Sequence, residues 1–230
     1  KKHLKSDLSF VSQLGITGYT NYFPITLYGP TYIVYDNNYL YISNNTYSRI
    51  LKYDTNFNYI SNIGFTAGYT NADFLSVYGL TIYDGYLYVA DQITGIITKR
   101  NLNEFDANFS FVGFGNDYNF FYAPFSADSD ENYYYVIDST IKRLQVVDKA
   151  TNQIVNYLGG PYAVASSTST GARSNFFNYP NYVLLDGDYI YISDRSSPRV
   201  AKYNKSDLSY ISQFGTGTAG ATTSTLNGPR

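Results

Sequence analysis

The sequence predicts an all-β fold made of four-stranded antiparallel sheets, and three repeated features carry that prediction. An apolar residue recurs three positions before a proline. A tyrosine-rich strand runs into Asp or Asn, followed five residues later by Arg, and an aromatic or apolar strand closes on glycine. The three features stay in phase over a period of about 50 residues, the length of one four-stranded unit. Because one such sheet cannot bury both of its faces, we expect successive sheets to stack around an axis as the blades of a β-propeller.

The segment 30–64 shows the unit most clearly. Strands rich in β-branched and aromatic residues are expected in it at 31–35, 39–43, 49–53 and 59–63. Asp36, Asn37 and Asn38 form the first turn between them, since Asn and Asp tolerate left-handed backbone angles. Residues 49–53 alternate polar and apolar side chains, which is typical of a half-buried strand.

The remaining units follow from the repeated pairs. The apolar residue and the proline are Leu27 and Pro30, Phe121 and Pro124, Phe177 and Pro180, and Leu226 and Pro229, with Val77 and Leu80 as a variant. The Asp or Asn and the Arg are Asn44 and Arg49, Asp138 and Arg143, and Asp194 and Arg199, whereas Asp91 is followed by Ile96.

The pairs give four complete blades, at about 30–64, 80–115, 124–160 and 180–215, and partial blades at the two ends. Residues 2–15 match 202–215, so we interpret 1–15 as the outer strands of a preceding blade. We expect residues 1–230 to form a single β-propeller domain that is part of a longer propeller. A five-bladed ring completed from both ends is the alternative, but its split blade would lack most of two strands.

The units resemble NHL repeats. The segments 88–91 (YVAD) and 191–194 (YISD) match the motif of that family, and Arg199 follows the second of them at the family's spacing. The segment 41–44 (YISN) matches it with Asn in place of Asp. The resemblance covers nearly the whole chain and implies a propeller fold. It implies little about function, because one fold serves many functions.

Composition excludes several function classes. A net charge of −2 and the absence of a Lys/Arg run argue against a nucleic-acid partner, which needs a basic face. The chain has no Cys, so disulfides and thiolate chemistry are excluded, and it has no apolar run long enough to span a membrane. Only 15% of its residues are charged, and Tyr, Asn, Ser and Thr are abundant. This composition favours an extracellular or cell-surface protein over a cytosolic enzyme.

The motifs with catalytic potential all have structural interpretations. His3 is the only histidine, so zinc sites and Ser–His–Asp systems are not expected, and we predict no metal and no cofactor. The GxGxxG pattern at 215–220 lacks a following helix and is interpreted as a loop between blades. Asp128, Asp130 and Glu131 are interpreted as a solvated turn. The repeated Asp and Arg are interpreted as a cap on the loop between them and its structural partner, because a binding site rarely needs the same pair in every blade.

The candidate binding residues are those that lie in connections or break the repeat: Tyr19, Tyr47, Tyr69, Tyr118 and Arg195. Loops between blades and loops between second and third strands share one face of a propeller, where tyrosines offer contact area to a protein or carbohydrate ligand. We therefore predict a non-catalytic interaction or structural module. Two alternatives stay open: a metal-dependent lyase or hydrolase with its site in the central channel, and a self-assembling fibre or surface-layer subunit that associates through open blade ends.

Overall fold

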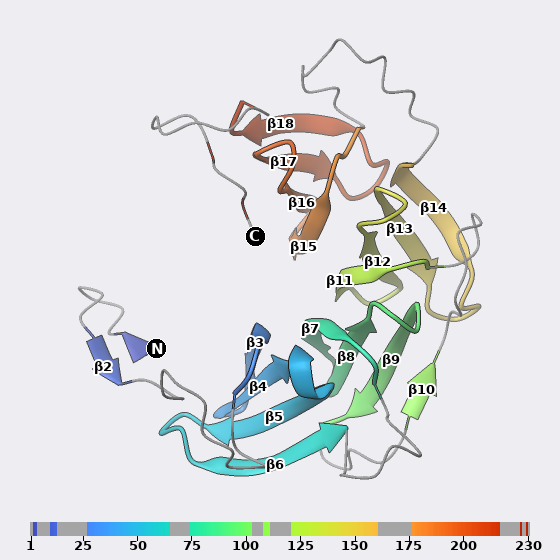
Figure 1. Cartoon of the computed structure of the whole chain (residues 1–230). Helices are drawn as coiled ribbons and strands as arrows, with labels where there is room; N and C mark the ends of the chain where they lie inside the picture. Colours follow the sequence, from blue (N-terminus) through green and yellow to red (C-terminus); the bar gives the residue numbers. More distant parts are fainter. Residues whose placement is uncertain are drawn as a thin grey trace. The chain divides into compact units, whose positions relative to one another are not determined.

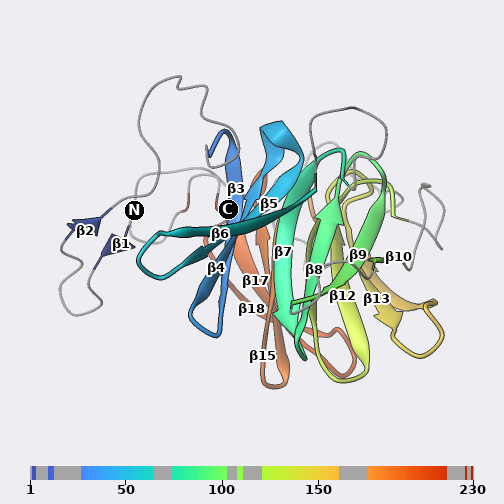
Figure 2. The same ribbon diagram turned by 90° about the horizontal axis from the view of Figure 1, so that it is seen from below.

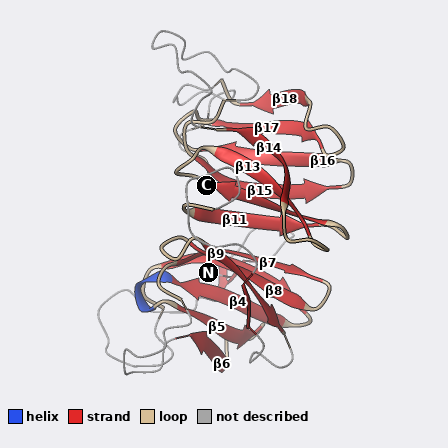
Figure 3. Cartoon of the chain, turned by 90° about the vertical axis from the view of Figure 1, so that its right-hand side faces the viewer, coloured by secondary structure: helices blue, strands red, loops and turns tan. Residues whose placement is uncertain are grey.

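We describe the fold from a computed structural model of the 230-residue chain. The structure describes residues 2–3, 10–12, 27–64, 74–102, 108–110, 121–160, 176–216, 226 and 229. Within these ranges the only helical element is the single 3-10 turn η1, Asn45–Tyr47 (Figure 3). All other regular elements are β-strands, and no helix in the described part of the chain is long and apolar enough to cross a membrane.

Four antiparallel four-stranded sheets follow one another along the chain, each with its strands in sequence order (Figure 1). The first contains β3 (Pro30–Asp36), β4 (Tyr39–Asn44), β5 (Arg49–Asp54) and β6 (Tyr59–Gly64). The second contains β7 (Val77–Tyr83), β8 (Tyr86–Asp91), β9 (Ile96–Asn101) and β10 (Asn108–Ser110). The third contains β11 (Pro124–Ser129), β12 (Tyr133–Asp138), β13 (Arg143–Asp148) and β14 (Ile154–Gly159). The fourth contains β15 (Pro180–Asp186), β16 (Tyr189–Asp194), β17 (Arg199–Asn204) and β18 (Tyr210–Phe214). Two short strands, β1 (Lys2–His3) and β2 (Phe10–Ser12), pair with each other before the first sheet.

The chain divides into two compact units, residues 1–77 and 78–230, and we describe each by itself. The first unit contains the pair β1–β2 and the first sheet. The second contains the third and fourth sheets, together with the second sheet from Tyr78 onward. In Figure 2, the neighbouring strands β7, β8 and β9 of the second sheet run roughly from the top to the bottom of the picture.

Tight turns close the first hairpin of each sheet, as the Asn- and Gly-containing turns predict. Asn37 and Asn38 have φ of 44° and 69°, and Asp84 and Gly85 have φ of 49° and 74°. Two consecutive residues at positive φ give a turn whose twist matches that of the flanking strands. The predicted turn at 36–38 is therefore confirmed, and residues 84–85 form the equivalent turn of the second sheet.

The largest core of the second unit lies between the third and fourth sheets. It consists of buried side chains from both sheets and their connections: Tyr135, Ile137, Leu144, Val146, Leu158, Phe177, Val183, Ile190, Ile192, Ala201, Tyr203 and Leu208. Successive side chains of a strand point to opposite faces, so each sheet presents one apolar set to each neighbour. This packing on both faces explains why β12, whose residues contribute to a core on each side of the third sheet, is apolar at nearly every position.

A glycine at the end of the fourth strand receives the apolar residue that precedes the next sheet. A Cβ on Gly159 would lie 2.8 Å from Phe177 Cδ2, and a Cβ on Gly64 would lie 3.0 Å from Phe74 Cδ2. Phe74 lies three residues before Val77, where β7 begins. The second sheet thus starts at Val77, three residues before the predicted start at 80, because Phe74 takes the position that the sequence analysis gave to Val77.

Candidate functional site

The strand registers define two ends of each sheet. Pro124 at the start of β11 pairs with Asp138 at the end of β12, and Asp138 also pairs with Arg143 at the start of β13. We call this end, which carries the connections between sheets and the loops between second and third strands, the connection end. The opposite end carries the hairpins between first and second strands and the turns between third and fourth strands, and we call it the hairpin end.

The first strands of the second unit lie side by side, so their connection ends coincide. A Cβ on Gly79 of β7 would lie 2.8 Å from Ser126 Cα in β11. The Val183 N–H in β15 donates to Ser126 Oγ at 3.3 Å. Two positions further along, Thr81 Oγ1 and the Leu185 N–H donate to the two carboxylate oxygens of Asp128, at 3.3 and 2.8 Å.

The acidic residue that recurs at the end of the second strand holds the connection end together by hydrogen bonds. Asp138 accepts N–H groups from both sides of it, Tyr122 at 2.6 Å and Ala123 at 3.1 Å before the sheet, and Thr140 at 3.1 Å and Ile141 at 3.2 Å after β12. Its carboxylate therefore fixes the connection and the loop to each other, a common way to satisfy loop N–H groups.

Asp194 does the same in the fourth sheet. It accepts the N–H groups of Asn178 at 2.9 Å, Tyr179 at 2.8 Å and Ser197 at 3.2 Å. The guanidinium of Arg199 donates to Gln213 Oε1 at 3.1 Å and to the carbonyl of Phe176. The predicted role of the Asp as a cap on its loop is thus confirmed for this sheet. The Arg was expected to pair with the Asp or the neighbouring blade, and it bonds to the next strand of its own blade and to the preceding connection.

Exposed side chains gather on the connection end of the second unit. Ile93 is 58% exposed and Tyr122 is 37% exposed. Arg195 is exposed, and its N–H donates to the Tyr179 carbonyl at 2.9 Å. The Tyr179 ring meets Phe125 edge-on with centroids 6.0 Å apart. We call Ile93, Tyr122, Tyr179 and Arg195 the connection surface of the second unit.

The first unit has a comparable group. Tyr28, 40% exposed, lies with its ring centroid 5.9 Å from that of Tyr47, and the Arg49 guanidinium lies 5.0 Å from the Tyr47 ring centroid. Leu75 is 51% exposed, and its carbonyl accepts the Ser48 hydroxyl at 2.8 Å. The connection end of this unit is therefore also aromatic and apolar.

Two of the predicted binding residues lie on these connection ends, Tyr47 in the first unit and Arg195 in the second. Tyr19, Tyr69 and Tyr118 lie outside the described residues. Tyr28, Leu75 and Tyr122 were not predicted as binding residues, and all three lie two residues before the start of a first strand. That shared position in the repeat is the signal that could have found them.

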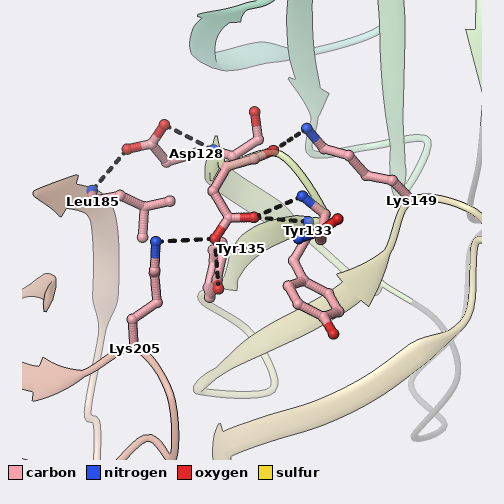
Figure 4. Close-up of polar contacts among 9 residues, drawn as sticks. Asp128, Tyr133, Tyr135, Lys149, Leu185 and Lys205 are labelled. Carbon is pink, nitrogen blue, oxygen red and sulfur yellow. Dashed lines mark hydrogen bonds and ion pairs between the residues drawn. The ribbon is translucent and has the colours of Figure 1, made fainter. Parts of the chain in front are cut away.

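A second polar cluster lies at the hairpin end, between the third and fourth sheets (Figure 4). Asp130 forms an ion pair with Lys205 at 3.2 Å and accepts the Tyr135 hydroxyl at 3.1 Å. Burial alone would raise the pKa of Asp130, but the N–H groups of Tyr133 and Asn132 and the Lys205 ammonium together lower it. Asp130 therefore stays ionised and ties the first hairpin of the third sheet to a turn of the fourth.

Asp128 has a different environment from Asp130. Burial between the first strands raises its pKa, although the N–H groups of Leu185 and Ser129 and the Thr81 hydroxyl act in the opposite direction. The interpretation of Asp128 as part of a solvated turn was wrong, because its position on β11 places it between two neighbouring first strands. Glu131 does lie exposed in the turn, as predicted.

Lys149 is also a charged group of this cluster. Its ammonium donates to the Asp130 carbonyl and lies 3.9 Å from the Tyr83 ring centroid and 4.9 Å from that of Tyr134. Burial lowers the pKa of Lys149. Aromatic faces replace part of the hydration that the ammonium loses. Among the described residues, no three His, Cys, Asp or Glu side chains are grouped so that they could hold a metal ion.

No protein-family model matches the chain, and no curated protein matches its sequence. Its structure is similar to solved structures of propeller proteins. A streptogramin B lyase structure matches with a TM-score of 0.57 at 10% identity, over 81% of this chain and 54% of that one. A nidogen–laminin complex matches with 0.60 at 15%, over 80% and 63%. A Kuenenia stuttgartiensis hydrazine synthase matches with 0.57 at 14%, over 85% and 52%.

The chain is a β-propeller. Its sheets are the blades of that fold, so the predicted fold class of four-stranded antiparallel blades is confirmed. Identities of 10 to 15% show a shared fold alone, and the chain spans between 52% and 63% of the length of these structures. That the blades are NHL repeats stays a prediction.

Proposed function

We propose that this propeller is a non-catalytic interaction module that binds a protein partner through its connection surfaces. The observation that carries the proposal is an exposed apolar residue two positions before the first strand of three successive blades: Tyr28 at 40%, Leu75 at 51% and Tyr122 at 37%. A ligand that covers an exposed apolar side chain removes its surface from water, so the recurrence of such a side chain at one position of the repeat, at the connection end, favours a binding surface there.

The chemistry of the second unit's connection surface supports a protein ligand. Tyr122 and Tyr179 offer flat amphipathic rings, and Arg195 offers a cation that can pair with a carboxylate. Tyr and Arg are the side chains that most often dominate the affinity of protein interfaces. The similarity to a propeller in a nidogen–laminin complex is in line with this use of the fold.

The charged groups at the hairpin end support a non-catalytic role. Asp128, Asp130 and Lys149 all bond to neighbouring strands or turns, which leaves them engaged in holding blades together. We further propose, from the low content of charged residues and the abundance of Tyr, Asn, Ser and Thr, that the protein acts at a cell surface or outside the cell.

A binding screen with matched variants tests the proposal. The purified chain is applied to an array of secreted and cell-surface proteins, and each binder is titrated against Tyr122→Ser, Arg195→Ala and the control Tyr210→Ser. Tyr210 is 38% exposed but lies at the hairpin end of the fourth blade. We expect the first two variants to weaken binding at least about tenfold and the control to leave it unchanged.

Two outcomes would overturn the proposal. One is that binding to every identified protein survives both connection-surface variants. The other is that a glycan array, and not the protein array, yields a ligand whose binding the same variants abolish, which would make the module a carbohydrate binder.

A further inference from the structure

The exposed charged side chains of the second unit are divided between the two ends of its blades. Among its described residues, the exposed carboxylates all lie in turns of the hairpin end: Asp84, Glu131, Asp186, Asp188 and Asp207. Arg195, at the connection end, is the one exposed cation in the same part of the chain. The hairpin end is therefore acidic on its surface, and the connection end is not.

The carboxylates of the connection end are withdrawn from solvent. Asp91, Asp138 and Asp194 are 1%, 0% and 0% exposed, and their oxygens accept backbone N–H groups of the surrounding loops. Lys142, half-buried in the loop after β12, adds a second cation to this end. An acidic ligand is thus attracted to the connection end and repelled by the carboxylates of the hairpin end.

A row of three aromatic rings adjoins Arg195. Tyr78, Phe125 and Tyr179 lie at the starts of three successive first strands, and each is half-buried, so part of each ring faces solvent. The ring centroids of Tyr78 and Phe125 are 4.4 Å apart, and those of Phe125 and Tyr179 are 6.0 Å apart. The Arg195 N–H donates to the Tyr179 carbonyl at 2.9 Å, which places Arg195 at one end of the row.

A β-bulge in β11 contributes to this arrangement. The pairing of β11 with β12 skips Phe125, which is therefore the extra residue of the bulge. Bulges redirect a side chain relative to a regular strand. At roughly 3.3 Å per residue, about three residues of an extended chain cover the length of the row.

We propose that the partner contacts the connection end through an acidic segment in an extended conformation. This inference rests on the proposed function and names the chemistry of the partner. Apolar or proline side chains of the segment pack on the rings of Tyr78, Phe125 and Tyr179, as such side chains do on other aromatic-lined surfaces. A carboxylate of the same segment pairs with the Arg195 guanidinium, whose fork of donors matches two carboxylate oxygens.

Selection from a phage library of random peptides tests the proposal, because it leaves the charge of the ligand open. The library is selected in parallel on the wild type, on Arg195→Gln and on the control Lys202→Gln. Lys202 lies 3.5 Å from the Tyr189 ring centroid, toward the hairpin end of the same blade, so the control removes a positive charge away from the row. We expect the wild type and the control to enrich peptides rich in Asp and Glu, and Arg195→Gln to lose that enrichment.

Titration of one enriched peptide measures the two parts of the contact. The peptide is synthesised as selected and with its Asp and Glu replaced by Asn and Gln, and fluorescence anisotropy follows binding. We expect Arg195→Gln to weaken the acidic peptide about tenfold and to leave the neutral one unchanged, and added salt to weaken only the acidic peptide. Tyr179→Leu removes a ring and should weaken both peptides. If this variant lacks a native circular-dichroism spectrum, Phe125→Leu replaces it.

Four results would overturn the proposal: enriched peptides that are neutral or basic, no enriched peptide, an acidic peptide that binds Arg195→Gln as tightly as the wild type, or ring variants that bind both peptides unchanged. Neutral peptides that lose binding in Tyr122→Ser would leave the proposed function standing while the acidic partner fails. Failure of the proposed function is seen separately, as binding of array proteins that survives Tyr122→Ser and Arg195→Ala.

Discussion

The carboxylate of Asp128 lies where the first strands of three blades approach one another, and burial raises its pKa above the ordinary 3.8. A raised pKa means that the folded chain takes up a proton at a higher pH than the unfolded chain does. Ionised Asp128 therefore lowers the free energy of unfolding above its folded pKa. That penalty is relieved as the pH falls through the raised value toward 3.8.

Replacing Asp128 by Asn tests this sign. The amide keeps an oxygen for the Leu185 N–H and removes the charge, so Asp128→Asn should raise the free energy of unfolding at neutral pH. Its advantage over the wild type should shrink on acidification, as measured by urea unfolding across pH. A pH-independent difference for Asp128→Asn would contradict the prediction.

The Asp138 carboxylate accepts four backbone N–H hydrogen bonds at the connection end of the third blade. In Asp138→Ala these four donors, of which those of Ala123 and Ile141 are buried, lose their acceptor, and we expect the free energy of unfolding to fall by about 3 kcal/mol. Asp148→Ala is the matched control, because Asp148 accepts N–H groups of Ala150 and Thr151 in an exposed turn. Chemical denaturation compares the two. Equal losses for both variants would contradict the assigned role of Asp138.

At the scale of the elements, each closing glycine joins one blade to the next. Gly159 has φ of +89°, and a Cβ there would lie 2.6 Å from the Lys142 carbonyl oxygen and 2.8 Å from Phe177. Gly159→Ala should therefore cost about 3 kcal/mol, since it adds backbone strain to a clash. Gly187→Ala has positive φ but open space, and should cost about 1 kcal/mol. Thermal melts of the two variants measure the difference between their losses of stability. Equal losses would show that the contact between Gly159 and Phe177 can widen to accept a Cβ, and would contradict the prediction.

The hairpin of the third blade is tied to the fourth blade by one ion pair. Asp130 and Lys205 are 3.2 Å apart and about three-quarters buried, at 23% and 27% exposure. A double-mutant cycle of Asp130→Asn and Lys205→Met should give a coupling energy of about 1 kcal/mol. Because the pKa of Asp130 is lowered, this stabilisation is present above 3.8 and is lost as the pH falls through the lower folded value. A coupling energy of zero at neutral pH would contradict the prediction.

At the scale of the whole molecule, the proposed non-catalytic role makes a prediction about metal content. We expect elemental analysis of the purified chain to show no stoichiometric metal and dialysis against a chelator to leave the thermal midpoint unchanged. Both expectations follow from the use of the described carboxylates in bonds between strands and turns. A metal near one per chain would favour the alternative of a propeller enzyme.

Local chemistry let the repeats be read from the sequence alone. Turn residues such as Asn37 and Gly85, the acidic caps Asp138 and Asp194, and the period of the strands depend on neighbours within one blade, so the all-β fold and the blades were predictable. The start of the second blade was misplaced because Val77 and Phe74 are both apolar. Only packing against Gly64 decides which of them fills the junction.

The tertiary structure decided what lies between blades. The sequence around Asp128 is typical of a turn, yet Asp128 bonds to Thr81 and Leu185 on two other first strands, which are 47 and 57 residues away from it in sequence. Tyr28, Leu75 and Tyr122 are ordinary loop residues in the sequence, and only the exposure of their side chains at one end of the sheets marks them as candidates. The sequence by itself determined the blade, because strand alternation and turn chemistry act over a few residues. The connection surfaces depend on which side chains a distant segment covers, and only the packing of blade on blade decides that.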